Sequence, residues 1–307
     1  SILSIAAIPL MYLTVKEFFD NKTAIFSIIL LTFSAYHIYY AQEARMYTFS
    51  WFFVIASNLF FIKSIKKDNK RNWIIYLITT TFAFYAHYSF LFVLFVQNIF
   101  VFTFWKKYEI KLIHWIGMQA AVIILFLPWF WASVIPYLII PTFVAKTSYL
   151  FIIRPSYETI FETFIFFIWG NNWIVRGYES RYIFFYKVFL FLIGVMIFFS
   201  TWTTFRQKES FHKKEAVFFM LLWCFLPISI LYLVSIFIKP CYLVRYLGLA
   251  LFPVYILIAY SLDKVRIKFL KIFVLTVFLI PNMFTLYRYY NFPFKGEARE
   301  IVQYIKS

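Results

Sequence analysis

The sequence of 307 residues is 64% hydrophobic, 25% aromatic and only 14% charged. Soluble domains carry roughly a quarter charged residues, so we exclude a soluble globular fold, which could not bury this much apolar surface. The formal net charge of +17 would suggest nucleic acid in a soluble protein. In a membrane protein basic residues instead mark cytoplasmic loops, and we expect no nucleic-acid partner.

Apolar stretches recur along the whole chain, and they predict about ten membrane crossings because one helix needs roughly 20 apolar residues. In chain order the predicted helices cover 2–15, 23–40, 46–62, 73–86, 88–105, 113–134, 182–205, 216–238, 244–262 and 269–286. The expected fold class is an all-α polytopic transmembrane helical bundle, forming one membrane-embedded domain over residues 1–307. The sequence opens inside an apolar stretch without an initiator Met, so we expect a fragment that lacks a first helix and a first external loop.

Basic residues are distributed unevenly between the loops. Most follow the first, third, fifth, seventh and ninth predicted helices, in clusters such as 63–71, 106–111, 206–214 and 264–271. The positive-inside rule makes these loops cytoplasmic and the intervening loops external.

The fourth predicted helix is short, since residues 73–86 span only about 21 Å at 1.5 Å per residue, against a bilayer core of roughly 30 Å. Its turn at His87 and Tyr88 is therefore expected below the external surface, beside a water-filled cavity. The alternative is one long helix over 73–105. That helix would place the lysine clusters on either side of it on opposite faces of the membrane.

The external loop over residues 135–181 contains one further predicted helix. Ser156 is a candidate N-cap, an apolar run extends from Tyr157 to Trp169, and Gly170 is a helix stop. We expect an interfacial helix lying on the membrane. Glu158 and Glu162 are spaced i, i+4 on it and could form a catalytic pair, although this spacing more often marks a solvated stripe.

Two short external turns carry charge at the mouths of apolar helices. Glu43 and Arg45 lie in the first turn, and Arg245 follows the second. Arginine suits phosphate because its planar guanidinium forms bidentate, charge-assisted hydrogen bonds. The plain alternative for Glu43 and Arg45 is an interfacial ion pair, and for His87 it is a structural hydrogen bond. No glycine-rich phosphate loop, Ser-His-Asp arrangement or Cys/His metal spacing is present, so no metal site is predicted.

Four motifs together resemble the bacterial GT-C glycosyltransferases, and most closely the dolichyl-phosphate-mannose protein mannosyltransferase-like branch. They are Gln42-Glu43-Ala44-Arg45-Met46-Tyr47, Tyr85-Ala86-His87-Tyr88, Leu127-Pro128-Trp129 and Arg245-Tyr246-Leu247. Their order and spacing extend the resemblance over nearly the whole chain. It implies an integral protein of the bacterial plasma membrane whose active site faces the external or periplasmic side.

The resemblance also implies an activity: transfer of a hexose or pentose, with inversion, from a polyprenyl-phosphate donor to an acceptor glycan, lipid or protein. Membrane lipids are further partners, and no cofactor is certain, although a divalent cation remains open. In the family an acidic residue of the first external loop is the main base. That loop precedes residue 1, so we expect the isolated chain to be inactive.

The resemblance implies a role for each site residue by its motif position. Glu43 is an accessory acid, while Arg45 and Arg245 bind the donor phosphate. The side chains expected to line the cavity are Tyr47, His87, Tyr88 and Tyr246. The alternatives are a transporter or flippase of lipid-linked sugars, for which an inverted repeat would argue, and a non-catalytic scaffold in which the charged groups satisfy one another.

Overall fold

The computed structural model describes residues 1–43, 45–135, 154–170, 180–206 and 211–291. Within these ranges all regular structure is helical, with twelve α-helices and no strand. The predicted all-α polytopic fold is therefore confirmed. The rest of the external loop, residues 136–153 and 171–179, lies outside the described residues.

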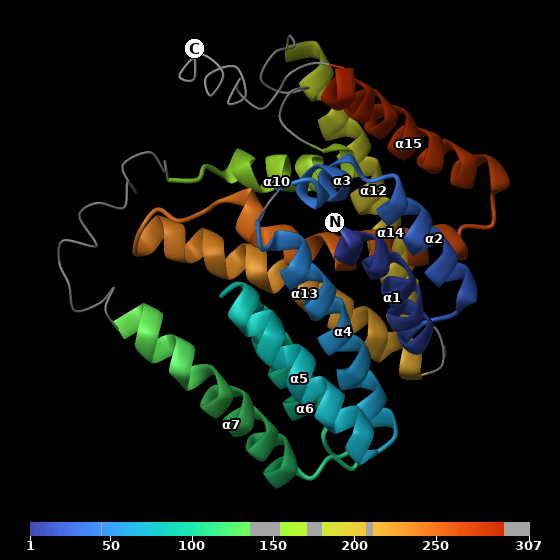
Figure 1. Cartoon of the computed structure of the whole chain (residues 1–307). Coiled ribbons are helices and arrows are strands. Elements are labelled where there is room, and N and C mark those ends of the chain that lie inside the picture. Colours follow the sequence, from blue (N-terminus) through green and yellow to red (C-terminus); the bar gives the residue numbers. More distant parts are fainter. Residues whose placement is uncertain (44, 136–153, 171–179, 207–210, 292–307) are drawn as a thin grey trace, which may run out of the picture.

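The N-terminal half contains eight elements (Figure 1). They are α1 (Ile2–Phe18), α2 (Asn21–Thr32), α3 (Ala35–Ala41), α4 (Tyr47–Lys66), α5 (Lys70–Ala86), α6 (Phe90–Phe104), α7 (Leu112–Trp129) and the π-helical η1 (Phe130–Val134). The break between α5 and α6 falls at the predicted turn, so the alternative of one long helix is wrong.

The C-terminal half contains six described elements. They are α10 (Tyr157–Trp169), α12 (Ser180–Arg206), α13 (Phe211–Phe237), the 3₁₀ helix η3 (Val244–Ala250), α14 (Leu251–Lys264) and α15 (Lys268–Asn291). The bounds of α10, its N-cap at Ser156 and its C-cap at Gly170 agree with the prediction. Its C-terminal half is buried against other helices, including Phe167 and Trp169, so only its first turns are free to lie at a surface.

Six helices are long and apolar enough to cross a membrane, within 47–66, 112–133, 184–206, 212–237, 244–264 and 268–291, and the bent pair of α2 and α3 adds a seventh if it counts as one span. Helices α1, α5 and α6 have 17, 17 and 15 residues, fewer than the roughly 20 that a crossing needs. By length and composition, six or seven described helices qualify, fewer than the about ten crossings predicted from apolar runs alone.

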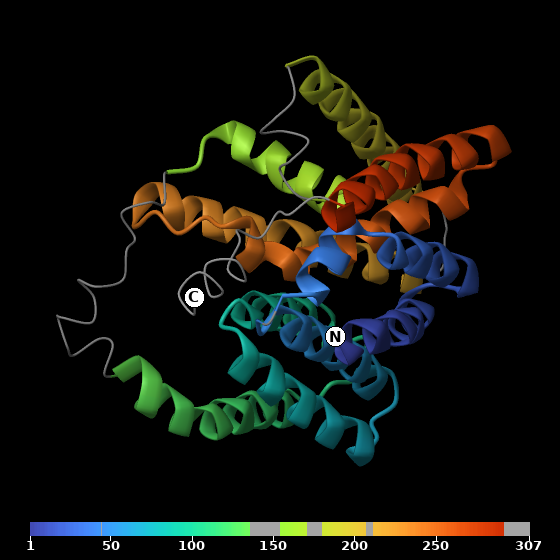
Figure 2. The same ribbon diagram turned by 45° about the horizontal axis from the view of Figure 1, so that its top comes forward.

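Helices α4 and α14 form the centre of the bundle. Every residue from Leu251 to Leu262 in α14 is buried, as expected for a helix that is apolar on all faces. By contrast, α7, α12 and α15 expose most of their apolar side chains. Figures 1 and 2 show α7 at one margin of the bundle and α12 and α15 at the opposite margin.

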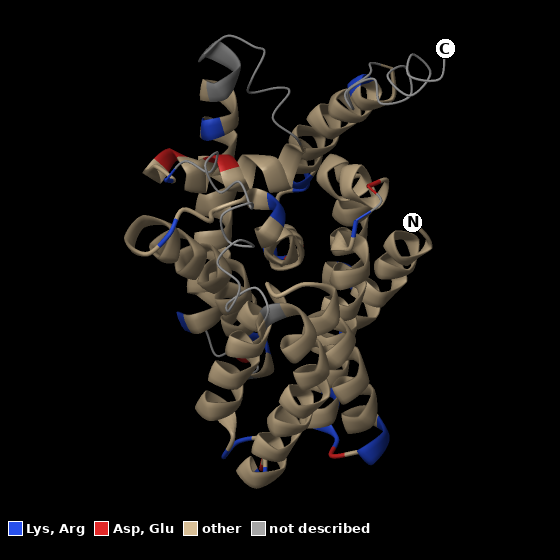
Figure 3. Ribbon diagram, turned by 60° about the vertical axis from the view of Figure 1, so that its left-hand side comes forward, with Lys and Arg blue, Asp and Glu red and all other residues tan. Residues whose placement is uncertain are grey.

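Charged groups gather at the ends of the helices, and the segments between the ends are almost free of them (Figure 3). At one end, ion pairs join loops predicted to share a membrane face: Lys66 contacts Glu17, Lys107 contacts Glu215, and Lys213 contacts Asp20 at 3.8 Å. The predicted grouping of these loops on a common side agrees with these contacts.

The chain bends sharply between α2 and α3, at the end of the bundle opposite these ion pairs. Helices α2 and α3 meet at 59°, because Ser34 begins a new helix by accepting a hydrogen bond from the backbone N–H of His37 at 3.0 Å. Buried Asn282 of α15 fixes this corner: its carbonyl oxygen accepts from Ala35 N at 2.8 Å and its amide donates to Ile168 O at 2.7 Å.

Gly248 allows η3 to approach α4 closely. A Cβ at this position would lie 2.4 Å from the indole of Trp51 in α4, so only glycine lets η3 pack this tightly against α4. The start of η3, which carries Arg245, is thereby held beside the start of α4.

Candidate active site

Segments far apart in the sequence meet at the end of the bundle opposite those ion pairs. They are the end of α3 with the turn after it, the start of α4, the turn between α5 and α6, the start of η3 and the end of α15. Each predicted site residue lies on one of the first four. The structure therefore brings them together, as a shared site requires.

Tyr47 lies at the centre of this group. Its ring centroid is 5.1 Å from that of Tyr40 and 5.8 Å from that of His87. The His87 ring is in turn 5.4 Å from the Tyr246 ring and 6.5 Å from the Tyr88 ring. These contacts connect α3, α4, η3 and the turn between α5 and α6 through a continuous set of aromatic rings.

The two predicted phosphate-binding arginines approach Tyr47 from different elements. Both Arg45, from the turn before α4, and Arg245, from η3, interact electrostatically with the Tyr47 hydroxyl. The guanidinium carbon of Arg245 lies 5.4 Å from the centroid of the Tyr246 ring, within cation–π range. The buried Nε of Arg245 has no hydrogen-bond partner, so this donor is available to a ligand.

The hydrogen bonds of His87 determine which ring nitrogen carries its proton. Its Nδ1 accepts from the backbone N–H of Ser89 at 3.1 Å and contacts the Ser89 hydroxyl at 2.7 Å. An Nδ1 that accepts a backbone N–H carries no proton, so the neutral ring carries its proton on Nε2. Burial, followed by the nearby charge of Arg245, lowers the pKa of His87 to about 4, so the ring is neutral at physiological pH.

Glu43 supplies the negative charge of the site. One carboxylate oxygen, Oε2, is buried without a hydrogen-bond partner, and the carboxylate interacts with the side chain of Tyr39. None of the described ion pairs joins Glu43 to Arg45, so the alternative of an interfacial pair finds no support. A buried acceptor without a donor is expected to bind a hydroxyl or another ligand group.

Sequence reasoning missed the wall formed by tyrosines of α3 and α15. The ring of Tyr39 lies 5.4 Å from that of Tyr289, and Gln42 donates to the Tyr290 hydroxyl at 2.6 Å. Paired tyrosines at two helix ends were the available signal. An aromatic-rich sequence gives no reason to prefer these pairs to the others.

The acidic pair on α10 does not belong to the site. Glu158 forms an ion pair with Lys187 at 3.5 Å, and both side chains are about half exposed, which favours the solvated stripe. Among the described residues, no group of three or more His, Cys, Asp or Glu side chains could hold a metal ion.

Comparison with known proteins finds a similarity in the N-terminal part of the chain. Residues 1–131 match the family described as dolichyl-phosphate-mannose-protein mannosyltransferase. No curated protein and no solved structure matches the chain. The match contains three of the four motifs that carry the resemblance, whereas the Arg245 motif lies beyond it. The match over residues 1–131 thus supports the resemblance of this chain to the dolichyl-phosphate-mannose-protein mannosyltransferase family, whose members are membrane glycosyltransferases of the GT-C type.

Proposed function

We propose that this protein transfers a sugar from a polyprenyl-phosphate donor to an acceptor hydroxyl at the external face of the bacterial plasma membrane. The observation that carries the proposal is the convergence of Arg45 and Arg245 on the hydroxyl of Tyr47, with a buried Nε of Arg245 unpaired. Two guanidinium groups beside a neutral donor, His87, form a site suited to a phosphate. The family match over residues 1–131 supports the same chemistry.

The proposed reaction is a single displacement at the anomeric carbon. The bond from this carbon to the phosphate oxygen breaks, and the lipid phosphate leaves with the electron pair. The acceptor oxygen forms the new bond from the opposite face, which inverts the configuration, and its proton passes to a carboxylate base. Arg45 and Arg245 stabilise the charge that develops on the departing phosphate.

Glu43 acts in this proposal as the accessory acid. Its unpartnered oxygen accepts a hydrogen bond from the acceptor and orients it, and Tyr39 positions the carboxylate. The resemblance assigns the main base to a loop that precedes α1 in the family. Helix α1 begins beside the site, since the Ser1 amino group donates to Ala41 O at 3.0 Å.

The test measures sugar transfer in membranes that contain the protein at its native length, with a radiolabelled polyprenyl-phosphate sugar. Replacement of either arginine by Ala removes one charged donor, and we expect transfer to fall by about 10²-fold or more. Arg245→Lys should recover only part of the activity, because an ammonium group lacks the planar fork.

The matched control is Arg154→Ala, at an exposed arginine that has no role in the proposed site. It should transfer sugar at the wild-type rate. Undiminished transfer by both Arg45→Ala and Arg245→Ala would contradict the site assignment. Movement of intact lipid-linked sugar across the bilayer, without transfer, would instead support the transporter.

A further inference from the structure

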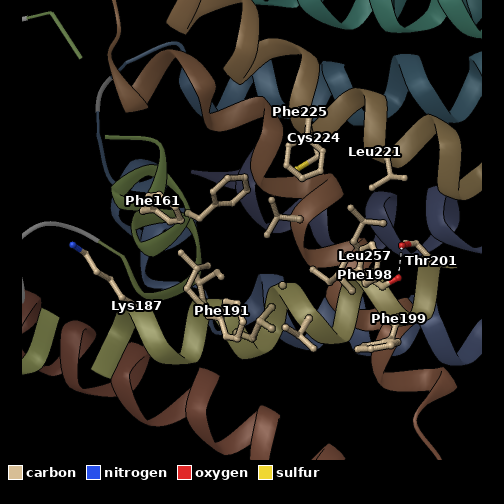
Figure 4. A pocket seen from close by; sticks show the side chains of 18 of the residues that line it. Phe161, Lys187, Phe191, Phe198, Phe199, Thr201, Leu221, Cys224, Phe225 and Leu257 are labelled. Carbon is tan, nitrogen blue, oxygen red and sulfur yellow. Dashed lines mark hydrogen bonds between the residues drawn. The ribbon is translucent and has the colours of Figure 1, made fainter. Parts of the chain in front are cut away.

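A long apolar groove lies between α10, α12, α13 and α14, separate from the candidate active site. Its volume is about 840 Å³. Side chains from all four helices, including Phe161, Phe191, Phe225 and Leu257, form its walls (Figure 4). It shares no residue with the group around Tyr47.

The groove follows one helix over most of its length. Along α12 it extends from Lys187 to Thr201, about 21 Å at 1.5 Å per residue. Its volume of about 840 Å³ leaves room for extended alkyl chains over this length.

The walls offer an occupant almost no polar contact along this length. The hydroxyl of Thr201 already donates to Phe198 O at 2.9 Å, and Cys224 is buried. The helices α12, α13 and α14 each contain a candidate membrane span, so the groove is open to the bilayer rather than to water. Its expected occupant is therefore a lipid.

Charge is confined to one end of the groove. There Lys187 of α12 and Glu158 of α10 face each other with 3.5 Å between Nζ and Oε1, and Figure 4 shows Lys187 at one end of the groove. One positive and one negative group at the mouth match a headgroup that carries both signs. An anionic headgroup would meet repulsion from Glu158.

We propose that this groove binds one zwitterionic phospholipid, a phosphatidylethanolamine. Its acyl chains lie along α12, its phosphate lies at Lys187, and its ammonium group lies at Glu158. The lipid joins α10 to α12 and covers apolar side chains that α12 leaves exposed, such as Phe191 and Phe198. This role is independent of sugar transfer.

Native mass spectrometry of the protein with equal amounts of dioleoyl phosphatidylethanolamine and dioleoyl phosphatidylglycerol tests the proposal. Gly194 lines the groove, and a Cβ there would meet no atom within 4 Å, so Gly194→Trp fills the groove without a clash at Cβ. We expect retained lipid to fall at least about tenfold, because displacing only two buried methylene groups has that effect. The smaller Gly194→Leu serves if the tryptophan variant does not fold.

The matched control is Gly117→Trp on α7, where a Cβ also meets no atom within 4 Å and which lies outside the groove. It should retain one phosphatidylethanolamine, as the wild type should. The exposed variant Glu158→Gln should shift retention toward phosphatidylglycerol. Equal retention by the Gly194 variants and Gly117→Trp would overturn the proposal, as would an unchanged headgroup preference in Glu158→Gln or retention of an isoprenoid phosphate in place of phospholipid.

Discussion

The turn that contains His87 determines which proton this side chain holds. Because Nδ1 accepts from Ser89, protonation of His87 would place a second hydrogen against the Ser89 N–H and break that contact. The charge of Arg245 also opposes a positive imidazole. His87 is therefore suited to donate from Nε2 to a bound phosphate and poorly suited to carry protons between acceptor and solvent.

This arrangement predicts how stability depends on pH. The folded protein holds the pKa of His87 at about 4, against about 6.5 for an unfolded histidine. Between these values the unfolded state binds more protons, so the free energy of unfolding decreases as the pH falls from 6.5 to 4. Thermal unfolding in detergent at pH 7 and pH 5 should show a smaller loss in His87→Gln than in wild type. The control His114→Gln removes an exposed imidazole; an equal loss in wild type and His87→Gln would contradict the prediction.

At the residue scale, sequence reasoning found the side chains whose chemistry is unusual for their surroundings. Glu43, Arg45 and His87 were identifiable because charged or titratable groups are rare beside apolar helices. Tyr39 and Tyr289 were not, since tyrosine is common throughout this chain and their pairing depends on the tertiary contact between α3 and α15. The tautomer of His87 likewise depends on the fold of its turn.

At the element scale, the position of η3 determines where Arg245 lies in the site. Gly248 in turn determines how closely η3 packs against α4. An alanine Cβ would meet the Trp51 ring at 2.4 Å, so the ring or η3 has to shift. Overpacking of this kind costs about 1–3 kcal/mol, and a shift of η3 moves Arg245 away from Tyr47. We therefore expect Gly248→Ala to lower both thermal stability and the rate of sugar transfer.

The matched control is Gly194→Ala, because a Cβ at that position meets no atom within 4 Å. Thermal unfolding and transfer assays on both variants, side by side, separate close packing from the general effect of replacing a helical glycine. Wild-type stability and transfer in Gly248→Ala would show that η3 tolerates the extra methyl group.

Helix positions were predictable because apolar runs are long, but the breaks inside them were not. The second predicted helix divides at Ser34, one polar residue whose capping role depends on the bend toward α15. The ninth begins as a 3₁₀ helix, and its Gly248 packs closely against Trp51 of another helix. Tertiary packing overrides local pattern at both places.

At the scale of the whole molecule, the two ends of the bundle differ in how their charges are satisfied. At one end Glu215, almost fully buried, accepts hydrogen bonds from Lys107 and Tyr108. These contacts tie α13 to the loop between α6 and α7, and burial with the Glu215 carboxylate raises the pKa of Tyr108. At the other end Glu43 and Arg245 retain unpaired polar atoms. The first end is suited to hold helices together, and the second to bind a ligand.

This division predicts that stability and function respond separately to substitution. Glu215→Gln removes the charge that Lys107 and Tyr108 contact, and we expect a loss of about 1–2 kcal/mol, moderate because Lys107 is partly exposed. Donor affinity should remain near wild type. Arg245→Ala should show the reverse, with weak donor binding and little change in thermal unfolding. The control for Glu215→Gln is Glu109→Gln, which changes an exposed carboxylate in the loop between α6 and α7. If Glu215→Gln abolished donor binding while leaving thermal unfolding unchanged, the buried carboxylate would belong to the functional site and the division between the two ends would be wrong.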